Sequence, residues 1–223
     1  MLDKIKELSK DTAIYGISTI FGRFLSFLLV PFYTNVFTTT EYGVFAYLYT
    51  ILAFMNIVYI YGMDAAFLKY ASVSENKNLK DIFSTPYIFI ASTGLFFSVL
   101  LITFHNPISA AMKVPAHYSH LLIYTVFIIF FDTAAIIPFA HLRLQRKSMK
   151  FAVIKIINIS INLVMNIVLI WGYHADIDAI FISNVAASVV TFLILTPEIF
   201  KKDVKIRIAL SSGCTGCNNG SGN

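Results

Sequence analysis

The sequence predicts an all-α, polytopic membrane protein, and two observations carry that prediction. Hydrophobic residues make up 57% of the 223-residue chain and charged residues only 13%, which leaves too little polar surface to cover a soluble globule of this size. Six apolar stretches also reach the roughly 20 residues that a helix needs to cross a bilayer. They do not alternate polar with apolar residues, as the shorter strands of a membrane barrel would.

The six predicted transmembrane helices follow one another closely. Their ranges are 12–37, 43–68, 83–104, 119–142, 151–173 and 177–198. The connections at 38–42 and 174–176 are short, so the first helix should lie antiparallel to the second, and the fifth to the sixth. Pro31 and Pro138 fall inside the first and fourth helices, where each removes a backbone hydrogen bond and favours a kink.

The chain divides into a charged leader, 1–11, a six-helix lobe, 12–198, and a tail, 199–223. The first apolar run is long and lacks an A-x-A-like cleavage site, so we expect its helix to remain in the mature protein. Residues 211–223 are polar apart from Cys214 and Cys217, which predicts either disorder or an artefact of truncation. The C-x-x-C spacing there stands without a second pair or a nearby histidine, so we attach no metal or redox role to it.

The distribution of Lys and Arg predicts the orientation of the helices. Fourteen of the 17 lie in the leader, at the second and fourth connections or after the sixth helix, whereas the other connections hold only Lys113. Because Lys and Arg collect on the cytoplasmic side of a membrane, both termini are expected in the cytoplasm. The same rule and anionic lipid headgroups account for the net charge of +5, so no nucleic-acid partner is expected.

Ionisable side chains also lie inside the predicted helices, where a charge costs about 2.5–3.5 kcal/mol. Arg23 is near the middle of the first helix, and small residues lie close to its face: Gly16, Thr19, Gly22 and Ser26. It could form an ion pair with Asp132 of the fourth helix, or it could attract phosphate or another anion in a hydrated cavity. Asp64, near the cytoplasmic end of the second helix, could pair with Lys69 or take part in transport.

A second polar line follows one face of the fifth helix. It consists of Lys155, Asn158, Asn162 and Asn166, at steps of three, four and four residues. In hydrocarbon, the donors and acceptors of a carboxamide lack hydrogen-bond partners unless another helix or water provides them. We therefore expect this face to point inwards, where the amides either bond to a neighbouring helix or line a cavity.

Patterns typical of enzymes and metal sites are missing from the sequence. It has no G-x-x-x-x-G-K nucleotide loop, no H-E-x-x-H and no pair of carboxylates in one loop, so we expect neither catalytic residues nor a cofactor. His105, His117 and His120 lie near the third connection without cysteine or carboxylate company. We expect no metal site there.

Motifs in the first seventy residues resemble a known family. The stretch from Leu8 to Thr34 contains Gly-Arg23, and Thr40-Glu-Tyr-Gly43 and Gly62-Met-Asp64 follow it. These motifs resemble the start of a bacterial polysaccharide-biosynthesis flippase, in the superfamily of multidrug, oligosaccharidyl-lipid and polysaccharide exporters. The resemblance extends to about residue 205. Where the family often has Arg just after the second motif, this chain has Lys69.

The resemblance implies a transporter of the bacterial cytoplasmic membrane, built from two six-helix lobes around a central cavity. Such proteins are taken to move undecaprenyl-diphosphate-linked oligosaccharides from the inner to the outer leaflet. Six helices would form one lobe, so the chain would need a missing C-terminal lobe or a second copy as partner.

Three hypotheses follow for the function. In the first, the chain is the N-terminal lobe of a lipid-linked oligosaccharide flippase. Its substrate-binding residues would be Arg23, Lys155, Asn158, Asn162 and Asn166. In the second, the same fold serves a cation-coupled multidrug exporter in which Asp132 or Asp64 binds the coupling ion. In the third, the chain is a non-transporting membrane scaffold in glycan assembly.

Overall fold

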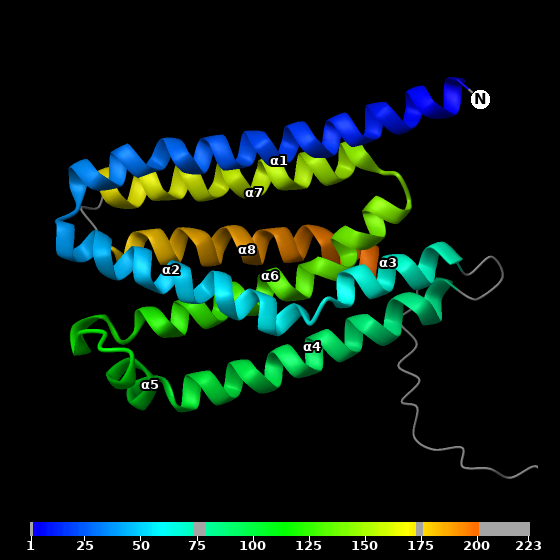
Figure 1. Ribbon diagram of the computed structural model, residues 1–223. Coiled ribbons are helices and arrows are strands. Elements are labelled where there is room, and N and C mark those ends of the chain that lie inside the picture. The colour runs from blue at the N-terminus through cyan, green and yellow to red at the C-terminus, as the bar shows by residue number, and fades with distance from the viewer. Residues whose placement is uncertain (1, 74–78, 173–175, 201–223) are drawn as a thin grey trace, which may run out of the picture.

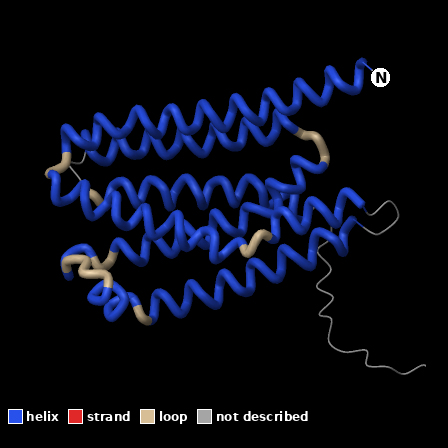
Figure 2. The backbone as a smooth tube through the Cα atoms, in the orientation of Figure 1, coloured by secondary structure: helices blue, strands red, loops and turns tan. Residues whose placement is uncertain are grey.

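The computed structural model describes residues 2–73, 79–172 and 176–200, and all regular structure in these ranges is helical (Figures 1 and 2). Six helical segments are long and apolar enough to cross a membrane: Thr12–Val36, Thr39–Val73, Ile82–Thr103, Ala116–Leu144, Ser148–Gly172 and Asp178–Pro197. The predicted number of spans is confirmed, and most bounds agree within a few residues. The predictions for the end of the chain, 211–223, fall outside the described residues.

Ten elements make up these spans and their connections. In chain order they are α1 (Leu2–Val36), α2 (Thr39–Ile60), α3 (Met63–Val73), α4 (Leu79–Thr103), α5 (His105–Ala111), the 3-10 turn η1 (Ala116–Tyr118), α6 (Leu121–Leu144), α7 (Ser148–Ile167), the π-helical turn η2 (Val168–Gly172) and α8 (Asp178–Phe200). Helix α1 begins at Leu2, so the charged leader continues directly into the first span. Helices α1 and α6 both continue through their prolines, Pro31 and Pro138.

The second span consists of two helices, although the sequence predicted one. Helix α2 starts with a capping box, in which the Thr38 side chain accepts from the Glu41 N–H and the Glu41 carboxylate accepts from the Thr38 N–H. It ends at Tyr61 and Gly62, which have φ angles of 52° and 69°. Left-handed backbone ends an α-helix, and Gly62 adopts it without strain. Helix α3 therefore starts afresh at Met63.

The centre of the bundle is the pair α6 and α8 (Figure 1). Helix α7 packs along α8 and α1 along α7, while α4 covers the other side of α6. The predicted pairing of the fifth and sixth spans is confirmed. The first span, in contrast, packs mainly against α7 and contacts α2 much less.

Helices α6 and α8 contact each other extensively, and both carry small buried residues. These are Ala134, Ala135 and Ala140 on α6, and Ala179, Ser183, Ala187 and Ser188 on α8. Helices surrounded by lipid gain little from burying apolar side chains against each other, so close backbone packing is what holds them together. This pair is the scaffold on which the other helices are placed.

The two ends of the bundle differ in chemistry. One end, called here the basic end, carries Lys69, Arg143, Arg146 and Lys147. The opposite end, called the far end, carries the connection between α1 and α2 and the beginnings of α6 and α8. At the far end four rings from three helices pack together, Tyr33 of α1, Phe45 and Tyr49 of α2, and Phe181 of α8.

Candidate functional site

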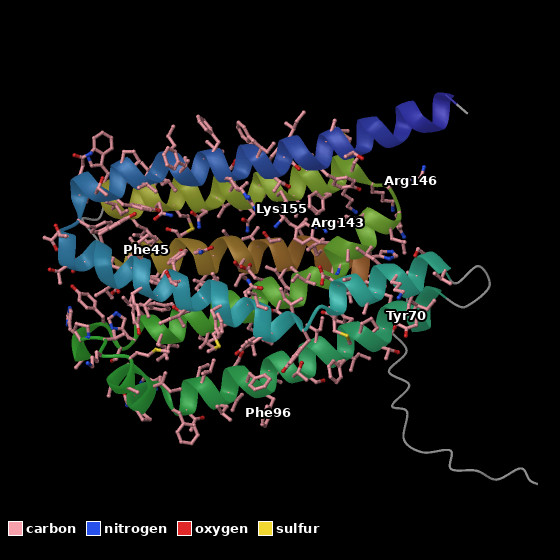
Figure 3. The ribbon with its side chains drawn as sticks, viewed as in Figure 1. Phe45, Tyr70, Phe96, Arg143, Arg146 and Lys155 are labelled. Atoms are coloured by element: carbon pink, nitrogen blue, oxygen red, sulfur yellow. The ribbon has the colours of Figure 1, made fainter. Side chains whose placement is uncertain are left out.

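Three adjoining hollows form a groove that leads from the basic end to the middle of the molecule, called here the basic groove. The first, about 490 Å³, lies between α1, α3 and the end of α6, and contains Lys69, Arg143 and Arg146. The second, about 540 Å³, shares Arg143 with the first and adds Arg23. The third, about 320 Å³, shares Arg23 with the second and adds Lys155. Figure 3 shows Arg146, Arg143 and Lys155 in this order from the basic end inwards.

Aromatic rings hold two of these cations in place. The guanidinium of Arg143 lies 5.1 Å from the centre of the Phe151 ring, and the Lys155 Nζ lies 4.7 Å from the centre of the Phe139 ring. The two rings pack edge to face, 5.2 Å apart. A ring face attracts a cation without neutralising its charge. None of the described residues that line the basic groove is acidic, so the groove keeps a net positive charge.

Arg23 lies on the exposed side of α1 and belongs to two of the three hollows. The ion pair with Asp132 that the sequence left open is not formed. Gly22, the residue before Arg23, allows α1 to pack closely against α7. A Cβ atom at this position would stand only 2.7 Å from Cδ1 of Ile159. The small-residue face next to Arg23 therefore serves helix packing and also leaves room at the groove.

Asp132 lies on α6, and its carboxylate accepts a hydrogen bond of 2.7 Å from the Ser188 hydroxyl of α8. The charges of Asp132 and Lys155 are close enough to act on each other. Asp132 is not among the residues that line the four hollows described here. Its surroundings are those of a polar contact between scaffold helices.

Asp64 lies in the first turn of α3, where the helix dipole favours a negative charge. The predicted ion pair with Lys69 is not formed. Lys69 lines the basic groove instead. Over the described ranges, no group of three potential metal ligands comes together, at Asp64 or elsewhere.

The polar face of α7 points inwards, as predicted. The Asn158 Nδ2 donates to the Ala187 carbonyl at 3.0 Å and to the Thr191 hydroxyl at 2.8 Å, both on α8. Asn166 is fully buried and donates to the Asn162 side chain at 3.1 Å. Asn158 and Asn162 also line a cavity, so the two explanations left open by the sequence both hold for Asn158.

That cavity, called here the amide pocket, adjoins the basic groove on the side of the far end. Its volume is about 280 Å³, and it is enclosed by α1, α2, α7 and α8. Its polar lining residues are Tyr33, Tyr49, Asn158, Asn162 and Asn184. The Asn184 Nδ2 donates to the Tyr49 hydroxyl at 2.7 Å. The pocket and the inner hollow of the groove share Asn158 and Ile159.

Sequence reasoning missed Tyr33, Tyr49 and Asn184 as candidates for the site, and treated Arg143 only as a marker of orientation. One pattern could have pointed to Asn184. Together with Ser188 and Thr191 it forms a polar line at steps of four and three residues on the last span, matching the line on the fifth. The two lines meet where Asn158 donates to Thr191 across the α7–α8 contact, whereas Ser188 bonds to α6 and Asn184 to α2.

The histidines near the third connection do have a carboxylate neighbour, contrary to the sequence-based expectation. His120 Nε2 lies 2.9 Å from an oxygen of Asp178, at the start of α8. The two residues are 58 positions apart, so only the packing of α6 against α8 brings them together. The contact joins the two scaffold helices at the far end.

Comparisons with known proteins identify the family. A family model described as "Polysaccharide biosynthesis protein" matches residues 8–210. An uncharacterised membrane protein of Haemophilus influenzae is 23% identical over 203 residues, which cover 87% of this chain and 46% of the relative. No solved structure matches the chain. The chain thus spans about half the length of this curated relative. With its six apolar helices it is a multi-pass membrane protein, and it belongs to the polysaccharide biosynthesis protein family.

Proposed function

We propose that the chain forms the N-terminal lobe of a flippase that moves oligosaccharide linked to undecaprenyl diphosphate across the bacterial cytoplasmic membrane. The observation that carries the proposal is the basic groove, a succession of cations along the side of an otherwise apolar bundle, with no acidic residue among the described residues that line it. The family match supports a role in glycan synthesis. Because the relative is about twice as long, a second lobe or a second copy would complete the cavity.

A diphosphate ester suits the basic groove on electrostatic grounds. Its negative charges must leave water when the headgroup crosses the bilayer, and only opposite charges and donors can replace the lost hydration. Arg23 and Arg143 offer planar forks of donors that match phosphate oxygens, and Lys155 adds a compact charge. Arg143 and Lys155 lie against phenyl rings, and neither forms an ion pair with a carboxylate of the described residues, although the charge of Asp132 acts on Lys155. Both cations can therefore still meet an anion.

The groove also gives the headgroup a direction of travel. The concentration of Lys and Arg at the basic end supports a cytoplasmic location for that end, where lipid-linked oligosaccharides would be loaded. The headgroup would first meet Lys69 and Arg146, and then pass Arg143 to reach Arg23 and Lys155. Each step keeps it beside at least one cation, because neighbouring hollows share Arg143 and Arg23.

A drug exporter that binds its coupling cation at Asp132 has less support. Asp132 bonds to Ser188 and does not line the groove. A groove lined by cations would also repel the positively charged compounds that many such pumps carry. Asp64, the other candidate, faces no cluster of potential ligands among the described residues. We therefore place neither residue in a substrate site.

Export of glycan by the full-length gene product tests the proposal. In cells that depend on this gene for surface glycan, Arg23→Gln and Lys155→Met should each reduce export by roughly tenfold or more, as expected for losing a charge-assisted contact. Export by Arg23→Lys should lie between that of Arg23→Gln and that of the wild type, because lysine keeps the positive charge but lacks the planar fork of donors. Lys113→Gln is the matched control, since Lys113 lies outside the groove. Unchanged export in Arg23→Gln, at normal protein levels, would remove the residue from the mechanism.

A further inference from the structure

The amide pocket has a lining that differs from that of the basic groove beside it. Its polar groups are three carboxamides and two phenols, and none of its lining residues carries a charge. Leu25, Leu29 and Ile180 provide apolar walls, and the Phe45 ring lies on the side of the far end (Figure 3). The pocket would therefore offer an anion no compensating charge, whereas it presents many donors and acceptors to a neutral ligand.

Several polar atoms of the pocket are left over after the internal hydrogen bonds. Asn158 uses its Nδ2 on α8 and keeps its Oδ1, and Asn184 uses its Nδ2 on Tyr49 and also keeps its Oδ1. The Asn162 Oδ1 accepts from Asn166, which leaves the Asn162 Nδ2 to donate. The Tyr49 hydroxyl accepts from Asn184 and retains its proton. Both acceptors and donors thus remain on residues that line one small space of about 280 Å³.

We infer that the amide pocket binds a neutral sugar ring, the one attached directly to the diphosphate. A sugar presents hydroxyl groups that both donate and accept, and apolar C–H faces that can lie against rings such as Tyr33 and Phe45. The inference rests on the proposed function and adds a specific place for the first sugar.

The position of the pocket matches the covalent structure of such a ligand. In a glycosyl diphosphate the sugar is bonded to the phosphate oxygen, so a sugar site must adjoin the phosphate site. The amide pocket and the hollow that contains Arg23 and Lys155 share Asn158 and Ile159 as a common wall. The pocket lies further from the basic end than Lys155 does (Figure 3), so a headgroup that enters sugar first would reach it while its diphosphate sits beside Arg23.

Binding of three matched probes to the full-length protein in lipid nanodiscs tests the inference. The first is farnesyl diphosphate, and the other two are farnesyl diphosphate that carries a single glucose and farnesyl diphosphate that carries a single N-acetylglucosamine. The wild type should bind at least one glycosylated probe roughly tenfold more tightly than the bare diphosphate. Tyr49→Phe and Asn162→Ala should each reduce that preference by about fivefold or more, the size expected for a neutral hydrogen bond. Affinity for farnesyl diphosphate itself should stay within about twofold.

Two controls separate recognition from folding. Tyr47→Phe removes the same hydroxyl from an exposed tyrosine two positions away on α2, and should change neither affinity. Val30→Phe adds a ring to the pocket wall without removing a polar group, and should also abolish the preference for the glycosylated probe.

The outcomes distinguish this inference from the function on which it rests. If the wild type binds none of the probes, the proposed function fails. If it binds all probes equally, or if Tyr49→Phe, Asn162→Ala and Val30→Phe leave the preference intact, the sugar site is wrong although the phosphate site stands. Arg23→Gln should weaken the binding of the bare and the glycosylated probes by the same factor, because it acts on the diphosphate that they share.

Discussion

Helices α6 and α1 are both apolar spans, yet they are embedded in the molecule to very different degrees. In the most apolar part of the fourth span, which contains α6, 61% of the residues are buried within the protein, against 12% for the first span, which belongs to α1. Helix α6 contacts α4, α8, α2 and α3, whereas α1 rests mainly on α7. Helix α6 is part of the scaffold that it forms with α8. Helix α1, called here the flank, is attached to this scaffold mainly through α7. The basic groove lies along the flank, where a wall can move without disrupting the core.

The unequal burial of α6 and α1 indicates how a polar site can exist in a membrane bundle. Polar residues between the scaffold helices bond to each other and so stabilise the packing. The Asp132 carboxylate, for example, accepts a hydrogen bond from Ser188. Arg23, on α1, forms no ion pair with another described residue, and we propose that it meets an anion instead. Four predictions test this contrast between the two helices, beginning with the one that should have the greatest consequence.

Replacing a scaffold ring should unfold the protein more readily than replacing a flank ring. Phe181→Ala, at a fully buried position on α8 next to Phe45 and Tyr49, should lower the free energy of unfolding by about 3–5 kcal/mol. Phe24→Ala, on the exposed side of α1, should change it by about 0.5 kcal/mol or less. Unfolding in mixed detergent micelles measures both. Equal losses would mean that α1 is as much a part of the core as α8.

A larger side chain at Gly22 should push α1 away from α7 and so weaken the attachment of the flank to the scaffold. Gly22→Val places side-chain atoms against Ile159 and should cost about 1–3 kcal/mol, together with a loss of glycan export. Gly16→Val is the matched control for stability, because no neighbouring atom lies within 4 Å of a Cβ atom at that position.

A second substitution checks that this cost arises at the named contact. Adding Ile159→Ala to Gly22→Val removes the clashing side chain and should restore much of the loss, which a double-mutant cycle measures. Absence of any coupling would show that the two helices do not meet there.

Neutralising the scaffold carboxylate should have a moderate effect on stability and little on transport. In Asp132→Asn the Ser188 hydroxyl can still donate to the amide oxygen, so the loss should be about 1 kcal/mol, the difference between a charged and a neutral acceptor. Glycan export should stay within about twofold of the wild type. Complete loss of export in a well-folded Asp132→Asn protein would instead support a coupling role for this acid.

The smallest effect is expected at the contact between His120 and Asp178. Both side chains are 40% exposed, and such pairs contribute about 0–1 kcal/mol. His120→Gln should therefore leave the free energy of unfolding almost unchanged at moderate salt, with any difference shrinking further at high salt. A loss above about 2 kcal/mol would show that the far end of the scaffold depends on this contact.

Much of the fold could be predicted because span formation depends on local composition. The inward face of the fifth span could also be predicted, since Lys155, Asn158, Asn162 and Asn166 recur with the period of a helix. The break at Tyr61 and Gly62 was missed because the run on both sides of it is mostly apolar and a single glycine is a weak signal. Asp178 was missed as a partner of His120 because the chain separates them by 58 residues.

The candidate site was predicted less completely than the fold. Arg23, Lys155, Asn158 and Asn162 do line hollows that adjoin one another, but the sequence could not show that Arg143 joins them or that Asn184 bonds to Tyr49, 135 positions away. The ion pairs considered for Arg23 and for Asp64 do not form. Complementary charges in a sequence say little about pairing, because the geometry of the packed helices decides which groups meet.

The sequence by itself determined that six helices cross the membrane, which of them carry polar faces, and where the basic residues gather. Each of these properties follows from a single segment, because transfer into lipid and helical periodicity are set residue by residue along the chain. Only the tertiary structure shows that α1 lies on α7, that Arg143 and Lys155 lie against phenyl rings, and that a neutral pocket adjoins a basic groove. Packing between helices in lipid depends on shape and small-residue contacts between distant segments, and hydropathy along the chain does not encode these.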